Sequence, residues 1–147
     1  MANKIERERA ATGYSGTPLI KKLGIKPDMA ECILGAPAHN AELLGPLPDA
    51  ITLSKRLKSA DKNLDFIHFF TKRKAAFESQ FAQLKAQLAK DGMLWVSWPK
   101  KASQVQTDMT EDVVRDYALS HGLVDVKVAA IDEVWSGLKL VYRLKDR

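Results

Sequence analysis

The sequence predicts an open, largely parallel α/β sheet with helices on both faces and an antiparallel hairpin at its C-terminal end. Strand-length apolar segments alternate with helical segments, which is typical of sheets whose parallel strands are joined by helices. Segment 64–70 is almost entirely apolar, as expected of a strand buried on both faces. The last two strand segments are joined only by 132–137, which is too short a connection for parallel strands.

The N-terminal part of the chain predicts short elements. Thr17 suits the N-cap of a helix, Pro18 suits its first position, and Gly24 suits its end because glycine adopts the left-handed conformation. The segments that follow are a strand over 29–35, its exit loop over 36–40, a helix over 41–44 and a second strand over 50–53.

The clearest amphipathic helix lies between residues 73 and 90, where apolar residues recur with helical spacing. A glycine follows this helix, and the apolar run 92–98 predicts a central strand that ends at Pro99. We therefore expect Leu94 and Val96 to be shielded from solvent. The apolar helix residues are Phe77, Phe81, Leu84 and Leu88.

The C-terminal part predicts one more helix and the hairpin. Asp108 and Glu111 have the spacing of a capping box, and Gly122 suits the end of the helix that they would begin. Gly137 lies in the expected turn of the hairpin, where it would permit a tight return of the chain. The two hairpin strands, rich in Val and Leu, are predicted over 123–131 and 138–144.

Composition predicts one domain. The chain has 147 residues, of which 46% are hydrophobic, enough to form a core of its own. Residues 1–13 mix charges of both signs without apolar periodicity, so we expect a mobile tail followed by a single α/β domain over 14–147. The net charge of +5 permits an anionic ligand or partner without requiring one, and its modest size argues against a nucleic acid as the partner.

Several function classes find no support in the sequence. Cys32 is the only cysteine, so neither an intramolecular disulfide nor a pair of metal-binding cysteines is possible. No signal peptide or membrane-spanning run is present, and we expect a cytoplasmic protein that has no membrane partner. No metal-ligand spacing, phosphate-binding loop or nucleophile motif occurs, so we predict no metal, assign no catalytic residue and favour a protein that is not an enzyme.

The order of these elements carries a resemblance. The helix ending over 23–27, the first strand, the stretch 88–97 and the terminal hairpin resemble the class I S-adenosylmethionine-dependent methyltransferases in a shortened form. The resemblance covers 17–144 as a pattern of elements and implies a Rossmann-like sheet. In such sheets ligands bind outside the carboxyl ends of the strands.

The resemblance also implies a cofactor site from which this sequence departs. Methyltransferases of this fold bind the cofactor with a glycine-rich turn after the first strand and an acidic residue at the end of the second. Here Gly35 is followed by Ala36 and Pro37, and segment 51–56 contains no acid. We therefore expect S-adenosylmethionine to bind weakly or not at all, and the sequence identifies no other cofactor.

A second resemblance concerns the whole chain. Four stretches resemble an uncharacterised bacterial family of small proteins, known as a domain of unknown function. This resemblance supports the fold and implies no activity. The stretches are 13–19, 42–48, 92–101 and 135–139.

The strand ends supply the candidate site. The expected carboxyl ends lie at 36–40, 70–72 and 97–101, and the turn 132–137 should reach the same edge of the sheet. Aromatic side chains beside charges on one rim are typical of a binding surface. The predicted ligand-binding residues are His39, Asn40, Ser97, Trp98, Lys100, Lys101, Asp132 and Trp135.

Three interpretations of function stay open at this point. The favoured one is a non-catalytic or small-ligand-binding module on a degenerate methyltransferase-like fold. The second is a small-molecule methyltransferase that has an atypical cofactor loop. The third is a basic adaptor that binds nucleic acid or an acidic protein through Lys72, Arg73, Lys74, Lys100 and Lys101.

Overall fold

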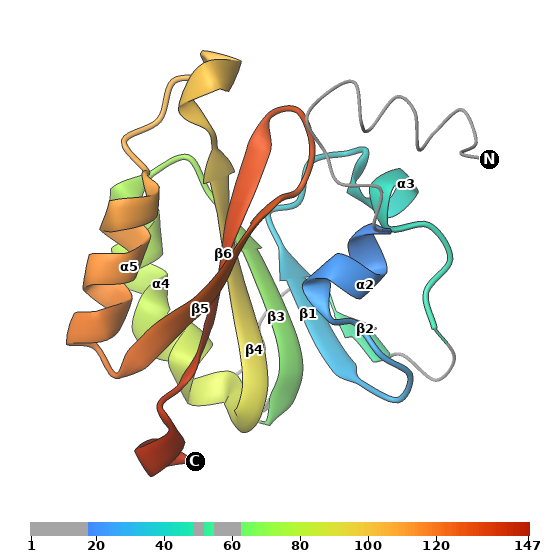
Figure 1. The fold of residues 1–147 in the computed structure, drawn as a ribbon, viewed down its shortest axis with the longest axis vertical. Coiled ribbons are helices and arrows are strands. Elements are labelled where there is room, and N and C mark those ends of the chain that lie inside the picture. The colour runs from blue at the N-terminus through green and yellow to red at the C-terminus, as the bar shows by residue number, and fades with distance from the viewer. Residues whose placement is uncertain (1–17, 49–51, 55–62) are drawn as a thin grey trace.

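The computed structural model describes residues 18–48, 52–54 and 63–147. These residues form one sheet with the strand order β2-β1-β3-β4-β6-β5 and helices on both faces (Figure 1), which confirms the predicted fold class. The elements are α2 (Leu19–Leu23), β1 (Ala30–Leu34), α3 (Asn40–Leu44), β2 (Thr52–Ser54), β3 (Leu64–Phe70), α4 (Lys74–Gln87), β4 (Leu88–Pro99), η1 (Lys101–Ser103), α5 (Glu111–Ser120), β5 (Leu123–Ala130), β6 (Trp135–Tyr142) and η2 (Leu144–Asp146).

The sheet is parallel except at its C-terminal end. β1 pairs in parallel with β2 on one side and with β3 on the other, and β3 pairs in parallel with β4. β6 runs antiparallel to both β4 and β5, as predicted for the hairpin. Because the chain passes from β1 to β2 on one side and then to β3 on the other, the strand order reverses between β1 and β3. Ligands of open α/β sheets bind at such a switch point.

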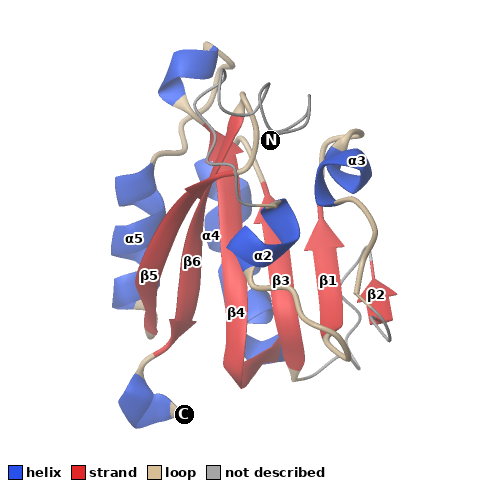
Figure 2. Ribbon diagram, turned by 45° about the vertical axis from the view of Figure 1, so that its right-hand side comes forward, coloured by secondary structure: helices blue, strands red, loops and turns tan. Residues whose placement is uncertain are grey.

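Two helical layers cover the sheet (Figure 2). α4 and α5 lie on one face, and α2 and α3 lie on the other. On the α4/α5 face, Phe77 and Phe81 of α4 belong to one buried cluster that also contains Val96 of β4. On the α2/α3 face, Leu23 of α2 and Trp95 of β4 belong to a second cluster. The sheet therefore separates two hydrophobic cores, as expected when helices cover both of its faces.

β4 is the central strand of the domain. Leu94 and Val96 face the α4/α5 core, and both are fully buried, as predicted. Trp95 faces the opposite core because successive strand residues point to opposite faces. Its indole N–H donates a hydrogen bond of 2.9 Å to the carbonyl of Leu23, which fastens α2 to the sheet.

The start of β4 differs from the prediction. The strand begins at Leu88, directly after α4, and not at residue 92. Leu88 lies in the same core as the helix residues before it, so its apolar character did not distinguish strand from helix. Gly92 lies inside β4, where a Cβ atom would come within 2.8 Å of the carbonyl oxygen of Leu64. Glycine therefore permits the close approach of β3 and β4 where their register shifts.

The predicted capping box of α5 is also wrong. The N-cap is Thr110, whose hydroxyl accepts a hydrogen bond of 3.1 Å from the N–H of Val113. Asp108 instead accepts a hydrogen bond of 2.7 Å from the N–H of Lys74 at the start of α4. Its carboxylate thus fixes the loop after β4 to a neighbouring helix, a long-range contact that local spacing does not reveal.

Gly24 and Gly137 have different structural roles. Gly24 ends α2 in the left-handed conformation with a φ of 86°, as predicted. Gly137, however, lies within β6 and not in the hairpin turn, because β6 begins at Trp135. A Cβ atom at Gly137 would lie 3.0 Å from the hydroxyl of Ser97. This position therefore requires the small size of glycine and not its conformational freedom.

Some predictions fall on residues that the structure does not describe. The tail predicted over 1–13 and the helix cap predicted at Thr17 lie outside the described residues. The strand predicted over 50–53 is described only from Thr52, where β2 begins. The single-domain prediction for 14–147 stays a prediction.

Three features of the described residues bear on the function classes. Cys32 of β1 is fully buried in the α4/α5 core, the usual place of a structural thiol. Within 18–48, 52–54 and 63–147, no helix is long and apolar enough to cross a membrane. In those same ranges, no group of three or more metal-ligating side chains is placed to hold an ion.

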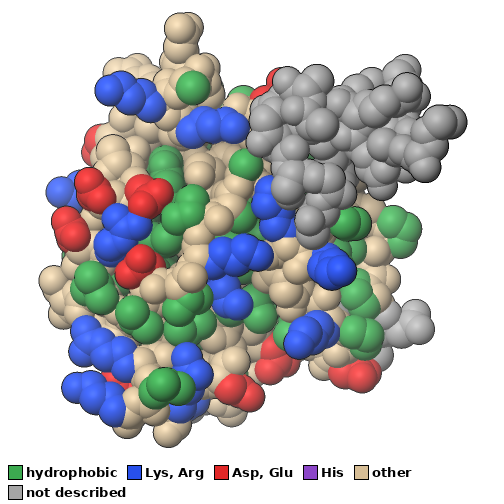
Figure 3. Space-filling model, in the orientation of Figure 1, with side chains coloured by type: hydrophobic (Ala, Val, Ile, Leu, Met, Phe, Trp, Pro, Cys, Tyr) green, Lys and Arg blue, Asp and Glu red, His purple; other side chains and the backbone are tan. Residues whose placement is uncertain are grey.

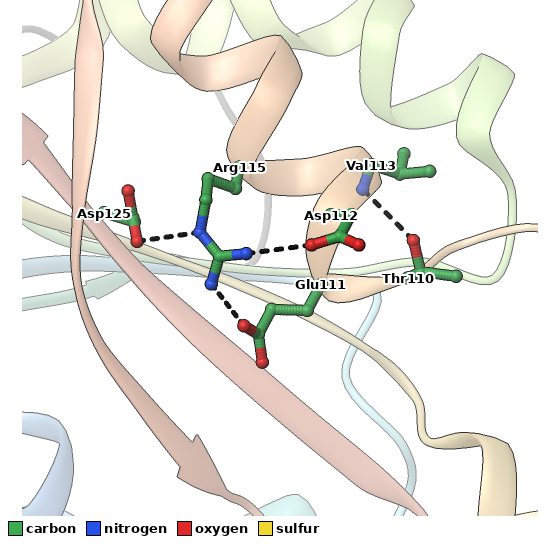
Figure 4. A network of polar contacts seen from close by, with 6 residues as sticks. All are labelled: Thr110, Glu111, Asp112, Val113, Arg115 and Asp125. Carbon is green, nitrogen blue, oxygen red and sulfur yellow. Dashed lines mark hydrogen bonds and ion pairs between the residues drawn. The ribbon is translucent and has the colours of Figure 1, made fainter.

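An arginine fastens α5 to the hairpin (Figure 4). The guanidinium of Arg115 donates from Nε to Asp125 of β5 and from Nη1 to Asp112 of its own helix, each over 3.0 Å. It also binds Glu111 through Nη2. Because three carboxylates surround one cation, removing the arginine would leave like charges facing one another.

We expect Arg115→Met to lower the midpoint of thermal unfolding by several degrees, since it leaves Asp125 and Glu111 without their partner. Scanning calorimetry at low salt would measure the change. Asp112→Asn is the matched control, because that side chain is mostly exposed and its loss should have little effect. An unchanged midpoint for Arg115→Met would show that the three contacts do not stabilise the fold.

Candidate ligand-binding site

A cleft of about 460 Å³ lies at the carboxyl ends of β1 and β3, next to the switch point of the sheet. Pockets that hold small molecules have volumes in this range. Its walls come from the exit of β1, the exit of β3, the loop after η1 and the hairpin turn. The lining residues are Gly35, Pro37, Phe70, Thr71, Lys72, Arg73, Val105, Val134 and Trp135.

Gly35 brings the two parallel strand ends together. Its φ of +69° is in the left-handed region that favours glycine. A Cβ atom at this position would lie 2.7 Å from the carbonyl oxygen of Phe70, so any larger residue would push β1 and β3 apart. The depth of the cleft therefore depends on this glycine.

The charge of the cleft is positive. Lys72 and Arg73 are exposed at its rim, and no acidic residue is among its described lining residues. Its floor is apolar, since Phe70 and Trp135 are buried and pack edge to face with their centroids 5.3 Å apart. A small molecule with an anionic group and an apolar body fits this combination.

A histidine and an aspartate, which do not themselves line the cleft, join two of its walls. His39 Nε2 lies 2.5 Å from Asp132 Oδ2, joining the exit loop of β1 to the hairpin turn. The other oxygen of Asp132 accepts hydrogen bonds from the N–H groups of Val134 and Trp135, at 2.8 and 2.6 Å. Asp132 is buried, whereas half of the His39 side chain is exposed. The pair thus fixes two walls of the cleft and leaves one ring edge open to solvent.

Three of the predicted site residues come together here. His39, Asp132 and Trp135 meet at the carboxyl end of the sheet, and Trp135 lines the cleft. Asn40 begins α3 and lines a different pocket of about 390 Å³, between β1 and α3. Its side chain is buried, and Oδ1 has no hydrogen-bond partner. That these residues bind a ligand stays a prediction.

Trp98 does not share a surface with Trp135, which corrects the prediction. Pro99 pairs with Trp135 and Trp98 pairs with Ser136, so both tryptophans lie at the same end of the sheet. Their side chains point to opposite faces, because Trp98 packs in the α4/α5 core and Trp135 in the other. The sequence indicated the strand ends but not the register that decides the face.

Ser97, Lys100 and Lys101 are also outside the lining of the cleft. Ser97 is fully buried and its hydroxyl lies 2.7 Å from Nε2 of His68. Lys100 follows β4, and its N–H donates to the carbonyl of Val134 over 2.8 Å. Lys101 begins η1 and is exposed. The basic residues that do line the cleft are Lys72 and Arg73, which follow a strand end that the sequence identified.

The exit of β1 does not fit S-adenosylmethionine in the manner of the family's glycine-rich turn. Pro37 has no N–H group to donate. The N–H of Asn40 already donates to the carbonyl of Pro37, and the N–H of Leu43 donates to that of His39. These two N–H groups therefore already donate hydrogen bonds within the loop and α3.

The second strand lacks the other cofactor contact. β2 ends at Ser54, and the sequence continues with Lys55 and Arg56. Neither the described residues of β2 nor the next two residues in the sequence include a carboxylate that could bind the ribose hydroxyls. The residues present do not fit the cofactor as the family binds it, and no methyl-transfer step follows from them.

Solved structures similar to this chain include methyltransferases. A S-adenosylmethionine-dependent methyltransferase from Aquifex aeolicus is 15% identical with a TM-score of 0.57, over 93% of this chain and 94% of that one. The N-methyltransferase NodS from Bradyrhizobium japonicum WM9 is 16% identical with a TM-score of 0.59, over 95% and 97%. The fold is methyltransferase-like.

A third solved structure and the sequence comparisons set the limits of this likeness. The protein DhpI, solved as a complex with SAH, is 11% identical with a TM-score of 0.61, over 95% of this chain and 87% of that one. Identities this low establish the fold alone. Neither a protein-family model nor a curated protein sequence matches the chain. Its resemblance to an uncharacterised bacterial family therefore stays a prediction.

Proposed function

We propose that this protein binds a small anionic ligand in the cleft at the switch point, and that it does so without methyl transfer. The observation that supports the proposal is the composition of the cleft: two cations at the rim, an apolar floor and no acidic lining residue among those described. The cations would attract the anionic group of the ligand, and the floor would contact its apolar body.

The methyltransferase-like fold supports the location of this site. In open α/β sheets the switch point is the usual place for a ligand, whatever the chemistry. The same fold favours a second candidate, a small-molecule methyltransferase that has an atypical cofactor loop. Two observations favour the first candidate. N–H groups near Pro37 already donate hydrogen bonds within the loop and α3, and the two residues that follow Ser54 are not acidic.

Calorimetric titration of the protein with S-adenosylmethionine separates the two candidates. We expect no measurable binding, because the loop after β1 offers neither a glycine-rich turn nor an acidic partner for the ribose. S-Adenosylhomocysteine, titrated in parallel, should behave in the same way. Low micromolar affinity for either compound would favour the methyltransferase and contradict the proposal.

A pair of matched probes tests the anionic site. We expect 2-naphthoate to raise the midpoint of thermal unfolding at millimolar concentration, since a ligand that binds only the folded state stabilises it. Its uncharged analogue 2-naphthamide should have no such effect, because it lacks the anionic group. Equal shifts with both compounds, or with neither, would contradict an anion-selective cleft.

Charge reversal at the rim should remove the effect of 2-naphthoate. Lys72→Glu combined with Arg73→Glu places repulsive charge where the anion would bind. Lys101→Glu combined with Lys145→Glu is the control, since it makes the same change in net charge at exposed positions outside the cleft. An undiminished shift in the first variant would place the ligand elsewhere.

A further inference from the structure

A second basic surface lies away from the cleft, over α2 and the β5–β6 hairpin. Figure 3 shows basic side chains gathered on this side of the molecule. Four lysines, which we call the lysine surface, come from α2, the loop after it and the two hairpin strands. They are Lys22, Lys26, Lys127 and Lys139.

Two of these lysines face each other directly. Lys127 of β5 pairs with Lys139 of β6 in the antiparallel register. Side chains at directly opposite positions are close neighbours, and like charges there are destabilising. Lys139 is only partly exposed, and burial together with the charges of Lys127 and Lys26 lowers its pKa. The fold thus keeps cations together at some expense of stability.

Other contacts hold part of this surface in place. Lys127 Nζ donates to the carbonyl of Lys22 over 3.0 Å, and Lys22 Nζ donates to the carbonyl of Ala130 over 2.9 Å. These bonds fasten α2 to the hairpin, which is a structural role for two of the cations. Lys139 makes no hydrogen bond or ion pair within the described part of the chain. The contacts that hold α2 against the hairpin therefore do not account for the positive charge of Lys139.

The surroundings of the paired lysines decide what kind of partner fits. Ala129, Gly137 and Val141 neighbour the pair on the same side of the hairpin, and all three are buried. Val126 and Val128, on either side of Lys127 in the chain, are exposed. Val128 pairs with Leu138 of the α4/α5 core and so points to the other face, which leaves Val126 as a small apolar area beside the lysines. Protein partners need an apolar centre in their interface, whereas a phosphate backbone is bound by charge.

We propose that the lysine surface binds the phosphate backbone of a nucleic acid without reading its base sequence. Lysine contacts each phosphate as a point charge, so the closely spaced ammonium groups suit a line of phosphates. The buried Trp95 beneath them offers no ring for stacking of bases. This surface and the cleft of the proposed function are separate, and either can be wrong without the other.

Fluorescence anisotropy of a labelled DNA duplex, titrated with the full chain, tests this proposal. We expect binding that weakens steeply between about 50 and 200 mM salt, because each lysine that contacts a phosphate releases a counterion. Engagement of the four lysines corresponds to a slope of about −3 to −4 in log affinity against log salt. Duplexes of unrelated sequence should bind alike.

Lys139→Glu separates function from folding. It should weaken duplex binding about tenfold at low salt, because it replaces an attractive charge by a repulsive one. The same change converts the like-charge pair with Lys127 into an opposite-charge pair, so the unfolding midpoint should hold or rise. Lys127→Glu is a second variant with the same expected loss of binding. Lys145→Glu, equal in net charge but at the exposed C-terminal end, should bind within about twofold of wild type.

Three results would overturn the proposal. One is the absence of duplex binding at the lowest salt concentration. Another is an equal loss of binding in Lys139→Glu and Lys145→Glu, since this would mean that net charge alone is responsible. A third is tighter binding of polyglutamate than of the duplex, because it would identify an acidic protein as the better partner.

Discussion

Leu94→Ala should lower the free energy of unfolding by about 2 to 5 kcal/mol, the range for large-to-small substitutions in a packed core. Leu94 is fully buried in β4, where it pairs with Ile67 of β3 and Leu140 of β6. All three side chains belong to the core on the α4/α5 face. A cavity at this position would have rigid strands on both sides, so the surrounding chain has little freedom to fill it.

Urea unfolding followed by circular dichroism would measure this loss. Phe81→Ala removes a buried ring from α4 in the same core and should give a similar result. Lys101→Ala is the control: its side chain is exposed, so its free energy of unfolding should stay within about 0.5 kcal/mol of wild type. A loss below about 1 kcal/mol for Leu94→Ala would contradict a packed core at the centre of the sheet.

The fold could be predicted from the sequence where the pattern of apolar residues was clear. Segment 64–70 was predicted as a strand and forms β3 with those bounds, because a run buried on both faces is apolar throughout. The antiparallel hairpin followed from the shortness of its connection. The bounds of β4 did not follow, since Leu88 is equally buried whether it ends a helix or begins a strand.

The site was harder to predict than the fold. Chain order indicated which residues lie at strand ends, and His39 and Asp132 do meet there. Register decides which face a strand-end side chain points to, and one residue of difference sends Trp98 and Trp135 to opposite cores. Long-range contacts such as that between Asp108 and Lys74 have no local signal at all.

Two buried ionisable groups on the α2/α3 side of the sheet are expected to give stability profiles with opposite slopes in pH. Glu31 of β1 is buried and neither carboxylate oxygen has a hydrogen-bond partner, and burial raises its pKa from 4.5 to about 7. His68 of β3 is also buried, beside Ser97, and burial lowers its pKa from 6.5 to about 3. Each pKa shift favours the neutral form of the side chain.

The sign of each contribution follows from which state binds the proton. Between pH 4.5 and 7 the folded state holds a proton on Glu31 that the unfolded chain releases, so stability falls as pH rises. Between pH 3 and 6.5 the unfolded chain protonates His68 and the folded state does not, so stability falls as pH drops. From pH 4.5 to 6.5 the two slopes oppose each other, and the wild-type profile should be nearly flat.

Glu31→Gln should therefore expose the slope of His68. In this variant we expect the free energy of unfolding to fall by about 2 kcal/mol between pH 7 and pH 5, because only the histidine still titrates differently in the two states. His68→Gln should show the reverse, a stability that rises by about 1 to 3 kcal/mol over the same interval. Glutamine has no titrating group, so any constant loss from its packing shifts the profile without tilting it. Urea unfolding across this pH range measures both slopes, and profiles parallel to wild type in both variants would show that neither group is neutral because of burial.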